Sequence, residues 1–162
     1  LNRLGCDVVV VNGEGCCGAL VHHLGEESAS RDHARALIKA WEQEQNKEGL
    51  DAIIVNTSGC GSHVKDFGHL LKDDDEWRAP AMRVASLTKD VSEIIDELGL
   101  PKRGAAEDGT RIAYHAPCTL LHGQKNRHAS RTLARTGGVC GDAREGETFL
   151  LWVCRHLQPC PA

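Results

Sequence analysis

The chain has 162 residues, a formal net charge of −4, 41% apolar residues and 26% charged residues. These values are ordinary for a soluble globular protein, and the length is enough for one domain with a sizeable core. The negative net charge argues against a nucleic-acid partner, which usually requires a basic patch. No apolar stretch approaches the roughly 20 residues that cross a bilayer, and no secretory signal precedes the first predicted strand.

Short apolar runs alternate with longer amphipathic stretches along the chain. In chain order they predict a strand at 7–12, a helix at 26–47, a strand at 51–56, a short helix at 62–71, a charged surface loop at 72–76, a weaker strand at 82–85, a helix at 87–98, a strand at 110–114 and a helix at about 120–135. This alternation is typical of an α/β fold in which helices flank a mostly parallel sheet.

Three cysteine-bearing segments each follow one of the predicted strands. Cys16 and Cys17 are adjacent and precede Gly18, and they follow the strand predicted at 7–12. Cys60 lies between two glycines after the strand predicted at 51–56, and Cys118 follows the strand predicted at 110–114. Ligands of parallel sheets bind beyond the carboxyl ends of strands, so we expect these thiols to meet at one rim of the sheet. The recurrence of strand, cysteine loop and helix also suggests an internal duplication.

The cysteines are expected to be reduced thiols with metal or redox chemistry. Eight cysteines would suit a disulfide scaffold only in a short secreted chain. Thiolates select zinc, copper(I) or iron–sulfur clusters. Structural zinc usually takes cysteines separated by two to four residues, whereas adjacent cysteines point apart and reach different irons of a larger cluster. Cys6, just before a strand, is expected to be a plain buried thiol.

Glycines and histidines accompany the thiols. Without a Cβ, the glycines beside the thiols allow the backbone to approach a cluster and aim an N–H at sulfur; they are Gly18, Gly59 and Gly61. Four histidines could be ligands or donors to sulfur, although each alone is more often a surface or loop residue; they are His22, His23, His63 and His115.

The cysteine motifs resemble the cysteine-rich CCG domain of iron–sulfur electron-transfer proteins. These include the B-type component of heterodisulfide reductase and the iron–sulfur subunits of glycolate, lactate and glycerol-3-phosphate dehydrogenases. The resemblance is carried by Gly15-Cys16-Cys17-Gly18-Ala19-Leu20 with His23, by Asn56-Thr57-Ser58-Gly59-Cys60-Gly61 with residues 64–71, and by Tyr114-His115-Ala116-Pro117-Cys118-Thr119-Leu120 with His122-Gly123-Gln124. It covers roughly residues 3–138 and is greatest toward the glycolate oxidase iron–sulfur subunit.

The resemblance implies an iron–sulfur cluster, of the 4Fe-4S type, bound by Cys16, Cys17, Cys60 and Cys118, with Gly18, Gly59, Gly61 and His115 beside it. Electrons would come from FAD-containing glycolate oxidase subunits that oxidise glycolate to glyoxylate, so the chain would not be active alone. Thr57 stands where the family has another cysteine, which leaves the first copy of the motif incomplete. The resemblance also implies a cytoplasmic protein, peripheral to the inner membrane only through partners.

The same resemblance predicts the domain organisation. Residues 1–138 would form a CCG-type domain of two partial repeats, about 1–100 and 101–138. An N-terminal part is expected to be missing, because the chain begins at Leu1 and the only methionine is Met82. Residues 139–162 do not resemble the family. A shifted reading frame is one explanation, because codons permitted for 150–158, read one base later, can spell Cys-Cys-Gly-Ser-Ala-Gly-Thr-Tyr; a terminal zinc or thiol site is the other.

Two other functions remain open from the residues. A thiol-based redox catalyst acting on disulfides, as in heterodisulfide reductase, would require a cysteine with a lowered pKa. A zinc-stabilised interaction module would bind zinc without iron or sulfide.

Overall fold

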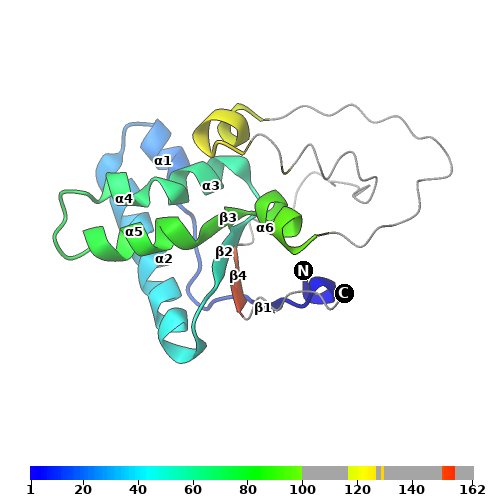
Figure 1. Cartoon of the computed structure of the whole chain (residues 1–162). Coiled ribbons are helices and arrows are strands. Elements are labelled where there is room, and N and C mark those ends of the chain that lie inside the picture. The colour runs from blue at the N-terminus through cyan, green and yellow to red at the C-terminus, as the bar shows by residue number, and fades with distance from the viewer. Residues whose placement is uncertain (100–116, 127–128, 130–150, 156–162) are drawn as a thin grey trace.

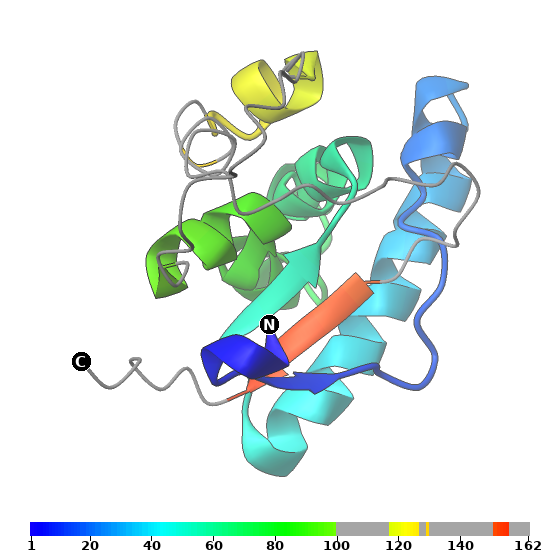
Figure 2. The same ribbon diagram turned by 90° about the vertical axis from the view of Figure 1, so that its right-hand side faces the viewer.

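A four-stranded sheet in the order β1-β4-β2-β3 forms the centre of the computed structural model, which describes residues 1–99, 117–126, 129 and 151–155 (Figure 1). The strands are β1 (Asp7–Val9), β2 (Ala52–Val55), β3 (Thr88–Asp90) and β4 (Leu151–Arg155). β2 pairs in parallel with β3, whereas β4 lies antiparallel between β1 and β2 (Figure 2). β1, β2 and β3 therefore run in one direction, and the predicted α/β class is confirmed.

Helices cover the sheet. They are the short η1 (Asn2–Leu4), α1 (Ala19–His23), α2 (Glu27–Glu48), α3 (Ser58–Lys65), α4 (Phe67–Leu70), α5 (Arg78–Leu87), α6 (Val91–Leu98) and the single turn η2 (Thr119–Gly123). The predicted long helix is confirmed as α2, and Gly49, whose φ is 84°, follows its last residue. Glycine adopts a positive φ without the steric penalty of a Cβ, so it can turn the chain out of the helix there.

The two faces of β2 enter two different cores. Ile53 and Val55 pack in a large cluster with Trp41 of α2 and Phe67 of α4. The alternate residues of the strand, Ala52 and Ile54, pack in a smaller cluster with Cys6 and Ile94. Successive side chains of a strand point to opposite faces, so the all-apolar sequence Ala-Ile-Ile-Val is what a strand buried on both faces requires. Cys6 is 5% exposed, which confirms the prediction of a buried thiol.

The strand predicted at 82–85 is wrong, because these residues lie inside α5. Ala81 and Val84 are buried three positions apart, which is the spacing of one helical face. Pro80 occupies the third position of α5. Its missing N–H costs little there, because the N–H groups of the first turn have no intrahelical partner. The strand β3 follows α5 directly, at Thr88–Asp90.

The helix predicted at 87–98 begins later, at Val91, because Asp90 caps it. Its carboxylate accepts a hydrogen bond from Ser92 N at 2.8 Å, and Glu93 Oε2 accepts one from Asp90 N at 2.7 Å. This reciprocal arrangement is a capping box, which satisfies two N–H groups that the helix leaves unpaired. The sequence Asp-Val-Ser-Glu carries that signal, and it defines the boundary between β3 and α6.

The strand β4 comes from the segment 139–162, which was predicted to lie outside the family resemblance. Val153 pairs with both Val9 of β1 and Ile53 of β2 in the register of the sheet. The strand predicted at 110–114 and most of the helix predicted at 120–135 lie outside the described residues, and η2 covers the start of that helix. The boundaries proposed for the two partial repeats stay a prediction.

Candidate metal centre

The loop that carries Cys16 and Cys17 follows β1 and ends where α1 begins. Gly18, directly before α1, has a φ of 84°, a left-handed conformation that favours glycine. A Cβ on Gly18 would lie 3.0 Å from His33 Cβ and 3.1 Å from the Ser30 carbonyl oxygen, both on α2. Gly18 N also donates a hydrogen bond to Cys16 Sγ at 3.4 Å, as expected for an N–H aimed at sulfur. The absence of a Cβ at Gly18 therefore allows this loop to pack closely against α2.

Cys60 lies inside a helix and not in a loop before one. The predicted helix 62–71 in fact begins at Ser58, and the chain then bends at Asp66 between α3 and α4. Cys60 is thus the third residue of α3 and is half-buried. Serine and glycine favour turns, so the small residues from Ser58 to Ser62 predict a loop, but packing against neighbouring segments stabilises them as a helix.

The thiols of Cys17 and Cys60 meet at the rim where β1 and β2 end. Cys17 is 3% exposed, while Cys16 is exposed. A hydrogen bond from Cys60 is the main cause that lowers the pKa of Cys17 to about 6, against the opposing effect of burial. The same hydrogen bond, together with burial, raises the pKa of Cys60. One proton is thus shared between a Cys17 thiolate and a Cys60 thiol.

These sulfur atoms form a soft donor set, but they do not close around a single ion. Across residues 1–99, 117–126, 129 and 151–155, no group of three or more His, Cys, Asp or Glu side chains is arranged to hold one metal ion. A Cβ built on Gly59, the residue before Cys60, would meet nothing within 4 Å, so there is open space at that position of α3. Thiolates are soft ligands, so the donor atoms of this site suit a larger soft metal centre such as an iron–sulfur cluster.

Cys118 lies on the neighbouring segment 117–126 and is exposed. This segment packs on α3, where Thr119 Oγ1 donates to Ser58 Oγ at 2.8 Å. A Cβ on Gly61 would lie only 2.6 Å from Gln124 Nε2, so packing against this segment accounts for that glycine. His115, which the resemblance placed beside the cluster, lies outside the described residues.

Two histidines, one on α1 and one on α3, form a partly buried pair. The ring centroids of His22 and His63 lie 5.1 Å apart, and His63 Nε2 lies 3.1 Å from the hydroxyl of Ser30. Burial, and secondarily His22, lowers the pKa of His63 to about 4, so its imidazole is neutral near pH 7. Ser30 was not among the residues predicted from the sequence. The available signal was its place four residues before Ala34, on the buried face of α2.

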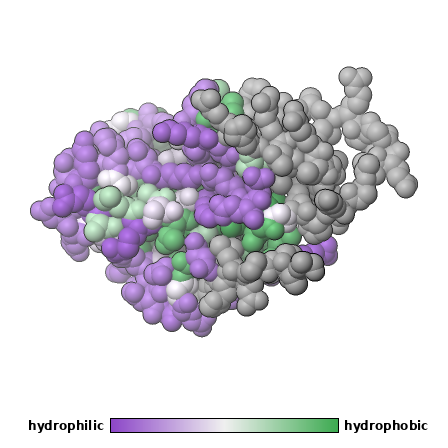
Figure 3. Space-filling view, viewed as in Figure 1, coloured by the Kyte–Doolittle hydropathy of each residue, from purple (hydrophilic) through white to green (hydrophobic). Residues whose placement is uncertain are grey.

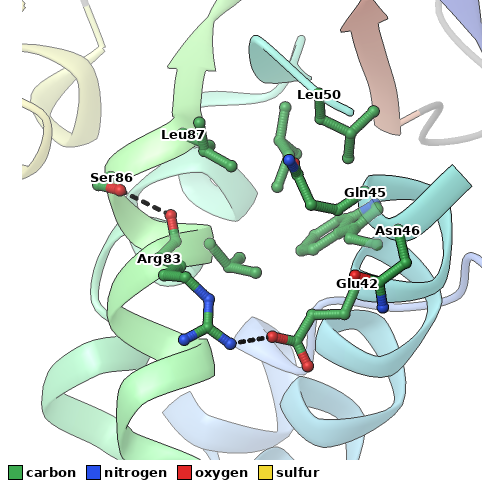
Figure 4. A pocket seen from close by; sticks show the side chains of 10 residues that line it. Glu42, Gln45, Asn46, Leu50, Arg83, Ser86 and Leu87 are labelled. Atoms are coloured by element: carbon green, nitrogen blue, oxygen red, sulfur yellow. Dashed lines mark hydrogen bonds and ion pairs between the residues drawn. The ribbon is translucent and has the colours of Figure 1, made fainter. Parts of the chain in front are cut away.

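A separate hollow of about 430 Å³ lies between α2 and α5 (Figure 4). Trp41 and Val84 are among its apolar lining residues, and an ion pair between Arg83 and Glu42 stands at its edge. The surface over the helices is otherwise largely hydrophilic in the view of Figure 3. No residue that the sequence singled out lines this hollow.

Among the helices described, none combines the length and apolarity needed to span a bilayer.

Comparison with known proteins bears directly on the thiol-bearing segments. Residues 1–65 match the family model of the cysteine-rich CCG domain. The chain is 38% identical over 143 residues to the glycolate oxidase iron-sulfur subunit of Escherichia coli (strain K12), covering 88% of the chain and 35% of that protein. It is 36% identical over 121 residues to the probable glycolate oxidase iron-sulfur subunit of Bacillus subtilis (strain 168), covering 74% of the chain and 26% of that protein.

A third relative is lactate utilization protein A of Anoxybacillus flavithermus (strain DSM 21510 / WK1), 30% identical over 129 residues, which are 78% of the chain and 51% of that protein. No solved structure matches. The match of residues 1–65 to this family model confirms the family resemblance predicted from the cysteine motifs. The chain spans about a third of its E. coli relative and about half of the lactate utilization protein.

Proposed function

We propose that this chain is part of an iron–sulfur electron-transfer subunit of an oxidoreductase of the glycolate oxidase type. The observation that carries the proposal is the meeting of Cys17 and Cys60, from segments that follow two different strands, in a shared hydrogen bond. The names of the E. coli and B. subtilis relatives support the same function. A bound iron–sulfur cluster would supply a one-electron redox centre.

The proposed ligands are the thiolates of Cys16, Cys17, Cys60 and Cys118. Cysteine must lose its proton to bind a metal, and the pKa of about 6 makes Cys17 the thiolate that is already mostly ionised at pH 7. The N–H of Gly18 donates a hydrogen bond to the sulfur of Cys16, and Gly59, the residue before Cys60, has open space at its own position on α3. Donors to sulfur and burial are the features by which a protein tunes the potential of such a centre.

The finer points of the proposal concern the whole oxidoreductase. We propose a cluster of the 4Fe-4S type, because adjacent cysteines suit a centre with several irons. Glycolate would be oxidised to glyoxylate on an FAD-containing partner, since a flavin accepts the hydride that a thiolate-bound iron centre does not. This chain would then pass electrons onward and would not be active alone.

Metal analysis after anaerobic reconstitution tests this function. The chain is incubated with iron and sulfide, desalted, and analysed for iron, sulfide and zinc, with electron paramagnetic resonance of the reduced sample. We expect iron and sulfide together, in less than full stoichiometry because both copies of the motif are incomplete, and loss of both in Cys17→Ser and Cys60→Ser. Cys6→Ala is the control, because Cys6 lies in a separate core. Bound zinc without iron or sulfide would contradict the proposal and favour the zinc module.

A thiol redox function is the second candidate, and the low pKa of Cys17 favours it. It requires a disulfide between Cys17 and Cys60 that forms and opens with a dithiol partner. Incubation of the metal-free chain in buffers with different ratios of reduced to oxidised dithiothreitol distinguishes the two functions. A Cys17–Cys60 disulfide that equilibrates reversibly, with no retention of iron, would favour this second candidate.

A further inference from the structure

Residues 117–126, here called the clasp, lie against α3 in the views of Figures 1 and 2, although more than fifty positions separate them in sequence. The clasp contains the single turn η2, in which Gln124 N donates to the Thr119 carbonyl at 2.9 Å, five residues back. Such π-type turns are rare, and they occur frequently at functional sites.

The first anchor of the clasp is the turn of α3 that contains Cys60. Besides the Thr119–Ser58 hydroxyl pair, Ser62 Oγ donates to the Thr119 carbonyl at 3.1 Å. Gln124 Nε2 donates to the Ser58 carbonyl at 3.0 Å. The two segments approach so closely that a Cβ on Gly123 would lie 2.6 Å from Ser62 Oγ. Three hydrogen bonds therefore join the segment of Cys118 to the segment of Cys60.

The second anchor is α6. Asn126 Nδ2 donates to Ser92 Oγ at 2.9 Å, and Ser92 Oγ in turn donates to Asp90 Oδ1 at 2.6 Å. Between the two anchors, Lys125 has a φ of 57°, in the left-handed region that residues other than glycine adopt at a cost. This turn lets Gln124 face α3 and Asn126 reach α6. Both amides are buried, at 8% and 6% exposure, so these contacts fix the clasp.

One atom of the clasp lacks a partner. Gln124 Oε1 is buried, and within the described segments no group donates a hydrogen bond to it. The hydrogen bond of Nε2 to Ser58 sets the orientation of this amide, so exchanging its two ends would bring two oxygens together. A buried acceptor without a donor is costly, so this oxygen is the atom of the clasp that a donor outside the described segments would satisfy.

We propose that Gln124 and Asn126 are the residues that position Cys118, because they fix the clasp against the turn of α3 that carries Cys60. Cys118 is the neighbour of Thr119, and Cys60 lies two residues from Ser58, on either side of the 2.8 Å hydroxyl contact. One composite site is thus shared between two segments that the sequence pattern assigns to different repeats. This inference rests on the proposed function for its use in binding iron, but its test requires no iron.

The test is chemical bridging of thiols in the metal-free chain. The variant Cys16→Ser/Cys17→Ser removes the competing thiols, and dibromobimane, which joins two thiols only when they lie close together, is then added. Peptide mass spectrometry locates the bridge. We expect Cys60–Cys118 to be the main bridged pair. Absence of this pair, with both thiols free to react with a monofunctional bimane, would overturn the inference.

Two glycines that flank Cys60 provide a matched comparison on this background. Gly61→Ala places a methyl group against the Gln124 amide and should lower the yield of the bridge by roughly tenfold, through loss of the hydrogen bond to Ser58. Gly59→Ala makes the same change two positions away, where the methyl group meets nothing within 4 Å, and should leave the yield unchanged. Equal yields in the two variants would contradict the role of Gln124.

A third variant removes the possibility that Gly61→Ala merely unfolds the chain. Asn126→Ala breaks the anchor to α6 without touching α3, and should lower the yield of the bridge while hydrogen exchange in α2 and β2 stays slow. Failure of this inference is distinguishable from failure of the proposed function. Iron and sulfide binding without the bridge would leave the proposed function with Cys16, Cys17 and Cys60 as its ligands, and the bridge without iron binding would leave only the clasp.

Discussion

Ser30 Oγ and His63 Nε2 lie 3.1 Å apart and connect α2 to α3, the helix that carries Cys60. Ser30 is fully buried, and its carbonyl oxygen is also the atom that a Cβ on Gly18 would approach to 3.1 Å. One residue of α2 thus lies against the segment that carries Cys17 and the segment that carries Cys60. The relative position of Cys17 and Cys60 depends on this contact as well as on the sheet.

His63 should make the protein less stable in mild acid. Its folded pKa of about 4 lies below the ordinary value of roughly 6.5. Between these values the unfolded chain binds a proton that the folded chain does not, so stability falls as pH decreases from about 6.5 toward 4. His63→Gln should lose part of this pH dependence, measured by urea unfolding at pH 7 and pH 5. His69→Gln, at an exposed position of α4, is the control, and an equal change in both variants would contradict the prediction.

Gly18→Ala should destabilise the metal-free chain by about 1–3 kcal/mol, because the left-handed backbone and the close contacts with α2 both oppose a Cβ. Gly15→Ala is the matched control in the same loop, where a Cβ would meet nothing within 4 Å. Denaturant unfolding of both variants provides the comparison. The prediction fails if Gly15→Ala costs as much stability as Gly18→Ala.

Cys60→Ala should raise the pKa of Cys17 from about 6 toward the ordinary thiol value, because the hydrogen bond from Cys60 is the main cause of the lowering. The measurement is the pH profile of iodoacetamide labelling at Cys17, followed by peptide mass spectrometry of the metal-free chain. Cys118→Ala removes a thiol that is not among the causes of this pKa shift, so the pH profile of labelling at Cys17 should be unchanged. A Cys17 profile that is the same with and without Cys60 would exclude the shared proton.

Glu14→Gln should stabilise the chain at pH 7 more than at pH 4. Burial raises the pKa of Glu14, although Trp41 Nε1 donates a hydrogen bond to its carboxylate at 3.3 Å. The folded state therefore favours the protonated acid, and its stabilising effect is lost as pH rises through the folded pKa. The amide keeps an acceptor for Trp41 without the charge. Thermal unfolding at both pH values tests this, with the exposed Glu76→Gln as a control that should show no such difference.

Local patterns in the sequence were sufficient for several elements. The helical spacing of apolar residues predicted α2, and an uninterrupted apolar run predicted β2, because burial on one or two faces leaves a direct periodic signal. The CCG motif predicted the family and the soft donor set, because adjacent thiols flanked by glycine have few other uses. The same reasoning failed at 82–85 and at 58–61, where short segments carry too few residues to establish a period.

Only the tertiary structure decided which of these residues meet. No sequence pattern relates Ser30 to His63, Gln124 to Gly61, or Asn126 to Ser92, since each pair lies on different elements. Sequence alone thus determined the chemical character of the site, because residue type sets softness and charge. Three-dimensional packing decided the proton sharing between Cys17 and Cys60 and the placement of the clasp, because hydrogen bonds and burial depend on distances that local sequence does not encode.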